Sequence, residues 1–98
     1  MVKHIVMWKL KDGPDKKERA EKIKRLLEDL RGKIPGLIQI EVGIDFSNTP
    51  ASADICLYSE LESREALQQY QVHPLHEAVK PVVTEATVER RVADYDVD

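Results

Sequence analysis

Tyr70, His73 and His76 lie in one short segment of the chain, with Pro74 between the two histidines. A histidine side chain gains or loses its proton near neutral pH, and a tyrosine hydroxyl beside it can donate or share one. Residues three apart share a helix face wherever helical geometry continues. We therefore expect any acid–base chemistry of this protein to occur at this segment.

His4 adds to this prediction, because it lies on the same face of a predicted strand as Val6 and Trp8. If that face meets the helices, His4 points toward the layer that contains Tyr70 and His76. Apolar walls with a few converging polar groups are the usual form of a small-molecule site. In such a pocket a histidine would act as general base, and Tyr70 would orient it or donate to an oxyanion. The predicted walls are apolar side chains from two strands: Val6, Trp8 and Leu57.

Structural roles for the same side chains compete with catalysis. Proline disfavours helical geometry in the residue before it, so His73 should leave one helix and cap the next. His73 is also a candidate contact for a bound ligand. The residue types leave open whether Tyr70 is only a core aromatic and His76 only a half-exposed side chain. If the catalytic interpretation holds, the Tyr70 hydroxyl and the His76 imidazole should lie within hydrogen-bonding reach, directly or through one water molecule.

A metal site would need more ligands than this segment supplies. His73 and His76 offer two imidazoles, and His4 or Glu77 would add a third ligand. Pro74 does not present both rings as a regular helix would. No second cysteine or dense set of carboxylates completes a shell. We therefore predict neither a metal ion nor a cofactor.

The composition predicts a single folded domain that covers residues 1–98. Hydrophobic residues make up 42% of the chain and charged residues 34%, a balance typical of globular proteins. No apolar run approaches the ~18 residues of a membrane-spanning helix, and the first residues lack the design of a signal peptide. Cys56 is the only cysteine, which excludes an intrachain disulfide and fits a reducing cytosol. We expect a cytoplasmic protein without a membrane partner.

Positive charge is concentrated in the first third of the chain, although the net charge of the whole is −3. A basic helix is one signature of nucleic-acid binding. Here Glu18, Glu21 and Glu28 lie among the basic residues, which is typical of a solvated helix face. We therefore predict no nucleic-acid partner.

Hydrophobic periodicity divides the chain into strands and helices. Apolar and polar side chains alternate in the strand segments, whereas Ile23 and Leu27 follow the helical period. Asp15 fits a helix N-cap with Glu18 placed for a capping box, and Pro81 should kink or end the last helix. The predicted strands cover residues 2–10, 37–46, 53–61 and 87–95. The predicted helices cover about residues 15–32, 63–72 and a short segment from residue 74.

The order of these elements is strand, helix, strand, strand, helix, strand. It predicts an α+β, ferredoxin-like βαββαβ fold, with the helices on one face of a four-stranded antiparallel sheet. The other face of the sheet still carries apolar side chains, and a chain this short has no third layer to cover them. We therefore predict a homodimer in which two sheets pack together as a dimeric α+β barrel.

Several motifs along the whole chain resemble the stress-responsive α/β-barrel domain (Dabb) family. The segment from Tyr70 to His76 is the most specific of them, and the others gain weight from their order. The remaining motifs are Val2-Lys3-His4-Ile5-Val6 with Trp8-Lys9, Ile34-Pro35-Gly36, Glu41-Val42-Gly43, Tyr58 to Ser63, Ala66-Leu67 and Asp94-Tyr95.

The resemblance implies a ferredoxin-like fold and a dimer whose two sheets form a barrel. It also implies site residues, since the family includes a plant polyketide cyclase, olivetolic acid cyclase, that works without a cofactor. By that resemblance His76 is the base, Tyr70 is its partner, and His4 with Trp8 forms the pocket wall. The first helix departs from the cyclase, because Ile23, Lys24 and Leu27 stand where the cyclase has aromatic side chains.

Three functions are consistent with these observations. The first is a homodimeric, stress-associated protein of unassigned activity that has a small apolar pocket in each subunit for a small hydrophobic ligand. The second is a cofactor-independent cyclase or lyase that uses His76 and Tyr70. The third, suggested by the shape of the wider dimeric α+β barrel group, is a monooxygenase.

Overall fold

The elements follow one another in the predicted order, and the short helix predicted from residue 74 is a full helix. A computed structural model describes all residues from 1 to 98. The strands are β1 (Val2–Leu10), β2 (Leu37–Ile44), β3 (Ile55–Leu61) and β4 (Thr87–Asp96). The helices are α1 (Lys16–Glu28), α2 (Arg64–Val72) and α3 (Pro74–Ala86).

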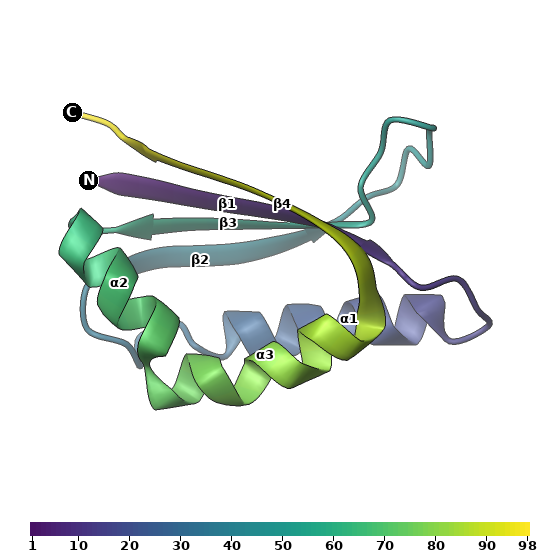
Figure 1. Cartoon of the computed structure of the whole chain (residues 1–98), viewed down its shortest axis with the longest axis horizontal. Helices are drawn as coiled ribbons and strands as arrows, with labels where there is room; N and C mark the ends of the chain where they lie inside the picture. The colour runs from purple at the N-terminus through teal and green to yellow at the C-terminus, as the bar shows by residue number, and fades with distance from the viewer.

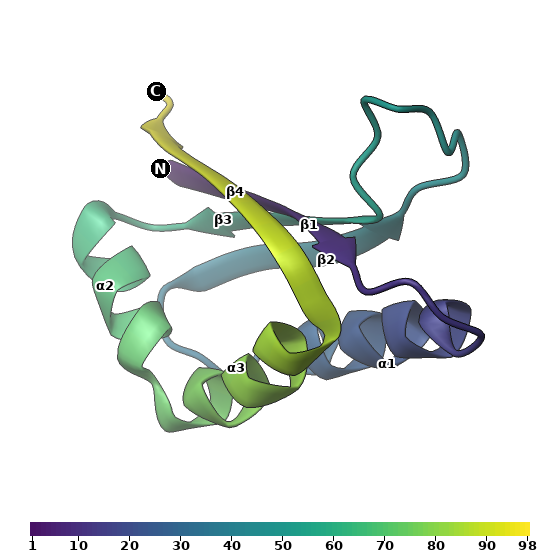
Figure 2. The same cartoon turned by 45° about the vertical axis from the view of Figure 1, so that its right-hand side comes forward.

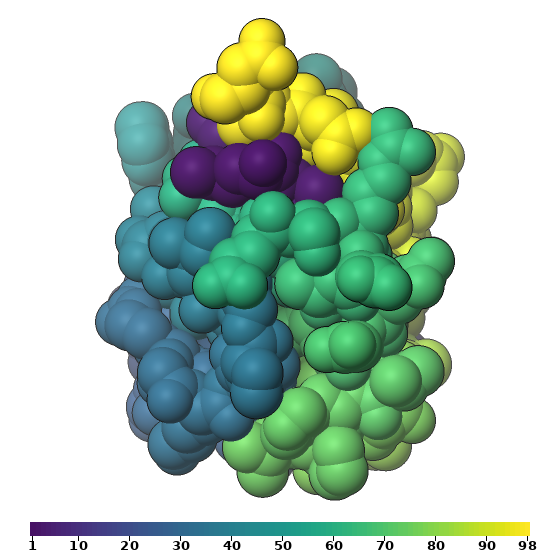
Figure 3. All heavy atoms as spheres, turned by 90° about the vertical axis from the view of Figure 1, so that its left-hand side faces the viewer, coloured from purple at the N-terminus to yellow at the C-terminus, as the bar shows by residue number.

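The four strands form one antiparallel sheet in the order β2-β3-β1-β4. All three helices lie on the same side of this sheet (Figures 1 and 2). The fold is therefore the predicted ferredoxin-like α+β arrangement, with helices on one face of a four-stranded antiparallel sheet. Both chain ends lie at one end of the sheet, where Val97 N–H donates to the Met1 carbonyl at 2.9 Å. Figure 3 shows the first residues (purple) beside the last ones (yellow).

Strand β1 is central, and its alternating pattern determines which side chains face the helices. Every second residue of β1 is buried, from Val2 to Leu10. His4 is among them and is only 3% exposed. Because side chains alternate between the two faces of a strand, His4, Val6 and Trp8 all point toward the helical layer. The sequence pattern predicted this placement correctly.

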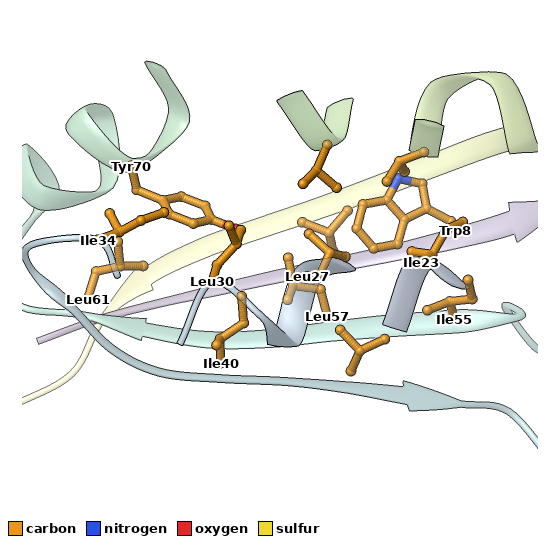
Figure 4. Packing of buried hydrophobic residues seen from close by; sticks show 14 of the residues in the cluster. Trp8, Ile23, Leu27, Leu30, Ile34, Ile40, Ile55, Leu57, Leu61 and Tyr70 are labelled. Carbon is orange, nitrogen blue, oxygen red and sulfur yellow. The ribbon is translucent and has the colours of Figure 1, made fainter. Parts of the chain in front are cut away.

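The hydrophobic core fills the space between the sheet and the helices. Helix α1 contributes Ile23 and Leu27, which are buried one turn apart, and β3 contributes Ile55 and Leu57. Figure 4 shows these side chains packed between the ribbons, with Trp8 toward one end of the cluster and Tyr70 toward the other. One apolar face per element thus builds a single core.

Helix α1 begins and ends differently from the prediction. The side chain of Asp15 forms no capping hydrogen bond, because its carboxylate accepts from Arg19 Nε at 2.8 Å instead. The helix ends at Glu28, and turns lead to Gly32, whose φ of +76° favours glycine. The capping box with Glu18 and the helical end near residue 32 were therefore wrong.

The junction between α2 and α3 follows the prediction more closely. Ser63 Oγ accepts from Ala66 N–H at 3.0 Å and caps α2. His73 then adopts an extended backbone, and Pro74 begins α3. Helix α3 is not short, since it continues through Pro81 to Ala86. The burial of Val79, Val83 and Ala86 along one face outweighs the cost of the proline.

The sheet face that points away from the helices, called the outer face below, carries several apolar side chains. Strand pairing aligns Ile5 with Tyr58 and Met7 with Cys56, and places Tyr95 opposite Lys3 on the same face. Met7 and Tyr95 are each 45% exposed in a single chain. This is the face on which the sequence predicts a second copy of the chain. No helix of the structure is both long and apolar enough to span a membrane.

Candidate functional site

A cavity of about 360 Å³ lies between α3 and the helix-facing side of the sheet. The predicted wall residues Val6, Trp8 and Leu57 all line it, and so do His4 and His76. The cavity volume lies in the lower part of the range found for small-molecule sites. The structure thus brings five of the seven predicted site residues to one cavity, from two strands and one helix.

Helix α3 supplies a side of the cavity that the sequence analysis did not identify. His76, Val79, Lys80 and Val83 all line it, at helical spacings of three and four residues. Residues at such spacings share one helix face. Leu27 of α1 completes the apolar wall. The helical period from residue 76 to residue 83 could have indicated this face, but the sequence analysis expected Pro81 to kink or end the helix.

Three aromatic rings meet at one end of the cavity. The ring centroids of His4 and Tyr70 are 6.1 Å apart in an edge-on arrangement. Those of Tyr70 and His76 are 4.3 Å apart, with the ring planes inclined by 31°. Because Tyr70 comes from α2, it packs against a histidine of β1 and one of α3 at the same time. The three rings that the sequence singled out are therefore neighbours.

Tyr70 contacts His76 through its ring and not through its hydroxyl. The side chain is fully buried, and its hydroxyl has no hydrogen-bond partner within the chain. Figure 4 shows the ring extending from α2 into the layer between helices and sheet, with its oxygen toward the middle of the core. Burial raises the pKa of Tyr70, so the phenol stays protonated. Tyr70 does not line the cavity, and its hydroxyl makes no direct hydrogen bond to His76.

His76 is held as a neutral imidazole with one free nitrogen. Its Nδ1 lies 3.3 Å from the carbonyl oxygen of Gln71, and a carbonyl can only accept, so Nδ1 carries the hydrogen. Nε2 is then left with its lone pair. Burial lowers the pKa of His76, and the nearby Lys80 adds to this effect, whereas the Gln71 carbonyl opposes it. A neutral imidazole with a free nitrogen can accept a proton.

His4 is held by a carboxylate that the sequence analysis did not include in the site. Its Nδ1–H donates to the carboxylate of Asp94 on β4, directly across the strand pair. This bond fixes the orientation of the ring and leaves Nε2 as the nitrogen available to a ligand. Asp94 was noted only as part of a family motif. The alternation of side chains along β4 indicated which face Asp94 lies on. It did not indicate that Asp94 meets His4, because that depends on the register between β1 and β4.

His73 lies apart from the cavity. Its Nδ1 accepts a hydrogen bond from Leu75 N–H at 3.1 Å, and its backbone has φ −64° and ψ 136°. The side chain therefore caps α3, as the proline after it suggested. The additional prediction that His73 contacts a ligand finds no support in the lining of the cavity. No group of three or more histidine, cysteine or acidic side chains is placed to hold a metal ion.

Comparisons with known proteins agree with this fold. The family model described as the Stress Responsive A/B Barrel Domain, Dabb, matches residues 2–97. An uncharacterized protein of Streptomyces coelicolor is 32% identical over 79 residues, which are 80% of this chain and 81% of that protein.

Solved structures extend the similarity over the whole chain. A dimeric protein of unknown function with a ferredoxin-like fold, from Bacteroides fragilis, is 34% identical with a TM-score of 0.87, covering 98% of this chain and 95% of that one. A protein from Arabidopsis thaliana is 25% identical with a TM-score of 0.82, covering 100% and 96%. Since the family model spans almost every residue, this chain belongs to the stress-responsive A/B barrel domain (Dabb) family.

Proposed function

We propose that this protein is a homodimer whose subunits each bind a small, largely apolar molecule in the cavity beneath α3. The observation that carries this proposal is the composition of the cavity wall. Val6, Trp8 and Leu57 form an apolar surface, and the imidazoles of His4 and His76 are the polar groups at its edge. This combination of a preformed apolar pocket and a few oriented polar groups is typical of ligand sites.

The two imidazoles favour proton transfer as a second candidate function. His76 has a free Nε2 and a lowered pKa, so it is neutral and able to accept a proton near neutral pH. His4 is oriented by Asp94 and presents its own Nε2. A bound molecule with an acidic C–H or O–H group would give its proton to His76. Its oxygen would lie near His4. This arrangement suits a cyclase or lyase that needs no cofactor.

Tyr70 has a positioning role in this proposal. Its ring packs against both imidazoles, and its centroid lies 4.3 Å from that of His76. A buried ring in such contact restricts the rotamers of the two histidines. Tyr70 thus acts through His76 and not by direct contact with the ligand.

The outer face supports the homodimer. Ile5 and Tyr58 lie side by side there, next to Met7 and Cys56, in the centre of the sheet. Large contiguous apolar patches on a small soluble domain are usually interaction sites. The related Bacteroides fragilis protein is dimeric. A second copy that packs sheet on sheet would remove this surface from water and produce the dimeric α+β barrel.

A thermal-shift screen of small apolar carbonyl compounds tests the proposed cavity. We compare the wild-type chain with His76→Ala and with His73→Ala, which removes an imidazole three residues away that does not line the cavity. Compounds that bind the folded state raise the unfolding midpoint. We expect some compounds to stabilise the wild type and His73→Ala equally but His76→Ala less.

Two outcomes would contradict the proposal. If no compound raises the midpoint of the wild type, the cavity is not a ligand site. If every active compound stabilises His76→Ala as much as the wild type, His76 does not contact the ligand. In that case the packed rings of His4, Tyr70 and His76 only stabilise the fold.

A further inference from the structure

The cavity has an apolar side and a cationic side. Val6, Trp8, Leu27 and Leu57 are buried and form the apolar side. The other side is lined by Lys80 from α3 and by residues of β4, among them Arg90 and one acidic residue, Glu89. A ligand that fills the cavity would therefore contact hydrocarbon at one end and positive charge at the other.

Arg90 is directed to the cavity by the register of the sheet. It pairs with Trp8 of β1, and residues opposite each other in an antiparallel pair lie on the same face. Arg90 therefore belongs to the helix-facing side, like Trp8. Its neighbours in sequence, Glu89 and Arg91, pair with Lys9 and Met7. Glu89 also lines the cavity, but its carboxylate lies 3.9 Å from the guanidinium of Arg91.

The guanidinium of Arg90 has no partner within the chain. None of the ion pairs or side-chain hydrogen bonds of the structure includes it. Lys80, by contrast, donates to Glu77 at 2.5 Å and to the Gln71 carbonyl at 2.6 Å. The unneutralised charge at the cavity is thus that of Arg90. Its planar fork of N–H donors matches a carboxylate in shape as well as charge.

We infer that the ligand is an amphipathic monocarboxylate. Its carboxylate binds Arg90 at the β4 side of the cavity, and its hydrocarbon body packs against Trp8 and Leu57. This inference rests on the proposed ligand-binding function and deepens it by naming the chemical class.

Calorimetric titration with octanoate and octan-1-ol tests the inference. The two probes share a chain length and differ in charge. We compare the wild-type chain with Arg90→Gln and with the matched control Arg25→Gln, an exposed arginine of α1 that lines no cavity and has no ion pair. A hydrogen bond between charged groups contributes to the free energy of binding. We therefore expect Arg90→Gln to weaken the binding of octanoate about tenfold.

Octan-1-ol should bind Arg90→Gln and the wild type alike, and Arg25→Gln should change neither affinity. Raising the salt concentration from about 0.1 M to about 1 M should weaken the binding of octanoate to the wild type but not that of octan-1-ol. This second measurement needs no variant, so it holds even if a substitution disturbs folding.

The outcomes separate this inference from the proposed function. If both probes bind and Arg90→Gln affects neither, the carboxylate assignment is wrong while the cavity remains a ligand site. If octan-1-ol binds and octanoate does not, the preference of the cavity for a carboxylate is wrong, and the cavity again remains a ligand site. If neither probe binds the wild type, the inference fails, and the thermal-shift screen with His76→Ala decides separately on the cavity.

Discussion

His4 and His76 line the same cavity but are held in different ways. His76 is bonded to a neutral carbonyl and its pKa is lowered by burial, whereas His4 is bonded to the carboxylate of Asp94. At the scale of single residues, the site thus contains two imidazoles whose Nδ1–H groups have different acceptors, and in each of them Nε2 is left free.

The lowered pKa of His76 predicts a pH-dependent stability. Above its ordinary value of 6.5 the side chain is neutral in both the folded and the unfolded chain, so it contributes no pH dependence. Below 6.5 the unfolded chain takes up a proton more readily than the folded chain, and stability falls. The free energy of unfolding should therefore drop as the pH decreases from 6.5 to the pKa of His76 in the folded chain. Below that pKa this side chain causes no further loss.

Urea unfolding at several pH values between about 5 and about 8 measures this effect. In His76→Gln this part of the pH dependence should disappear, while His73→Gln should retain it. The pKa of His76 also depends on the charges of Lys80, Glu77 and His4. Both variants keep these three residues. An unchanged pH profile in His76→Gln would show that burial does not perturb this histidine.

The bond between His4 and Asp94 predicts a second effect at this scale. Asp94→Ala should lower the free energy of unfolding by about 1–2 kcal/mol, because the buried Nδ1–H of His4 loses its acceptor. Asp96→Ala is the matched control, two residues along the same face, where the carboxylate pairs with the exposed Arg64. Its loss should be smaller, because water screens this exposed ion pair. Urea unfolding that gives equal losses would contradict the proposed difference between the two carboxylates.

At the scale of elements, the site depends on how α2 is seated against the end of β2. Gly36 lies in the turn before β2 with φ +84°, and a Cβ there would lie 2.7 Å from Ala66 Cβ of α2. Tyr70 is one turn further along α2. The absence of a side chain at Gly36 therefore lets α2 approach closely enough to bring Tyr70 between the two histidines.

Gly36→Ala should destabilise the protein more than Gly32→Ala does. Both glycines have a positive φ, so alanine costs about 1–2 kcal/mol of backbone strain at each. Only Gly36 also meets a neighbour, since nothing lies within 4 Å of a Cβ at Gly32. Overpacking adds about 1–3 kcal/mol at Gly36. Chemical denaturation of the two variants measures the difference, and similar midpoints would mean that α2 shifts freely away from the turn.

At the scale of the whole molecule, the outer face is the feature that a single chain leaves unexplained. Met7 and Tyr95 are both large and 45% exposed, on the face of the sheet that no helix covers (Figure 1). In a single chain this face contributes nothing to the core between the sheet and the helices. A dimer would use both faces.

Met7→Glu should convert the proposed dimer to a monomer. Packing sheet on sheet would place this charge in an apolar interface without a partner, which is costly. Sedimentation equilibrium at micromolar concentration should give twice the 11.2 kDa chain mass for the wild type. Val72→Glu, a similar substitution at an exposed position of α2, should leave the dimer intact. A wild-type chain that sediments at 11.2 kDa would exclude the homodimer.

The local pattern of the chain was sufficient to predict its elements and their order. The alternation of His4, Val6 and Trp8 along one strand, and the effect of Pro74 on His73, follow from backbone geometry over a few residues. These features need no knowledge of distant neighbours, so the fold class and the helix-facing position of His4 could be predicted. The helix does not end at Pro81, one of the two outcomes predicted there, because burial along α3 outweighed the local preference.

Only the tertiary structure decided which of these residues meet and through which atoms. The pairing of His4 with Asp94 depends on the register between the first and last strands, and the charge of Arg90 faces the cavity for the same reason. The position of α2, which approaches Gly36 closely, brings the ring of Tyr70 against His76 but gives its hydroxyl no partner within the chain. Strand register and helix seating arise from packing between segments far apart in the chain, which a pattern along the sequence does not contain. The sequence by itself thus determined which side chains are available for chemistry, and packing determined how they are arranged.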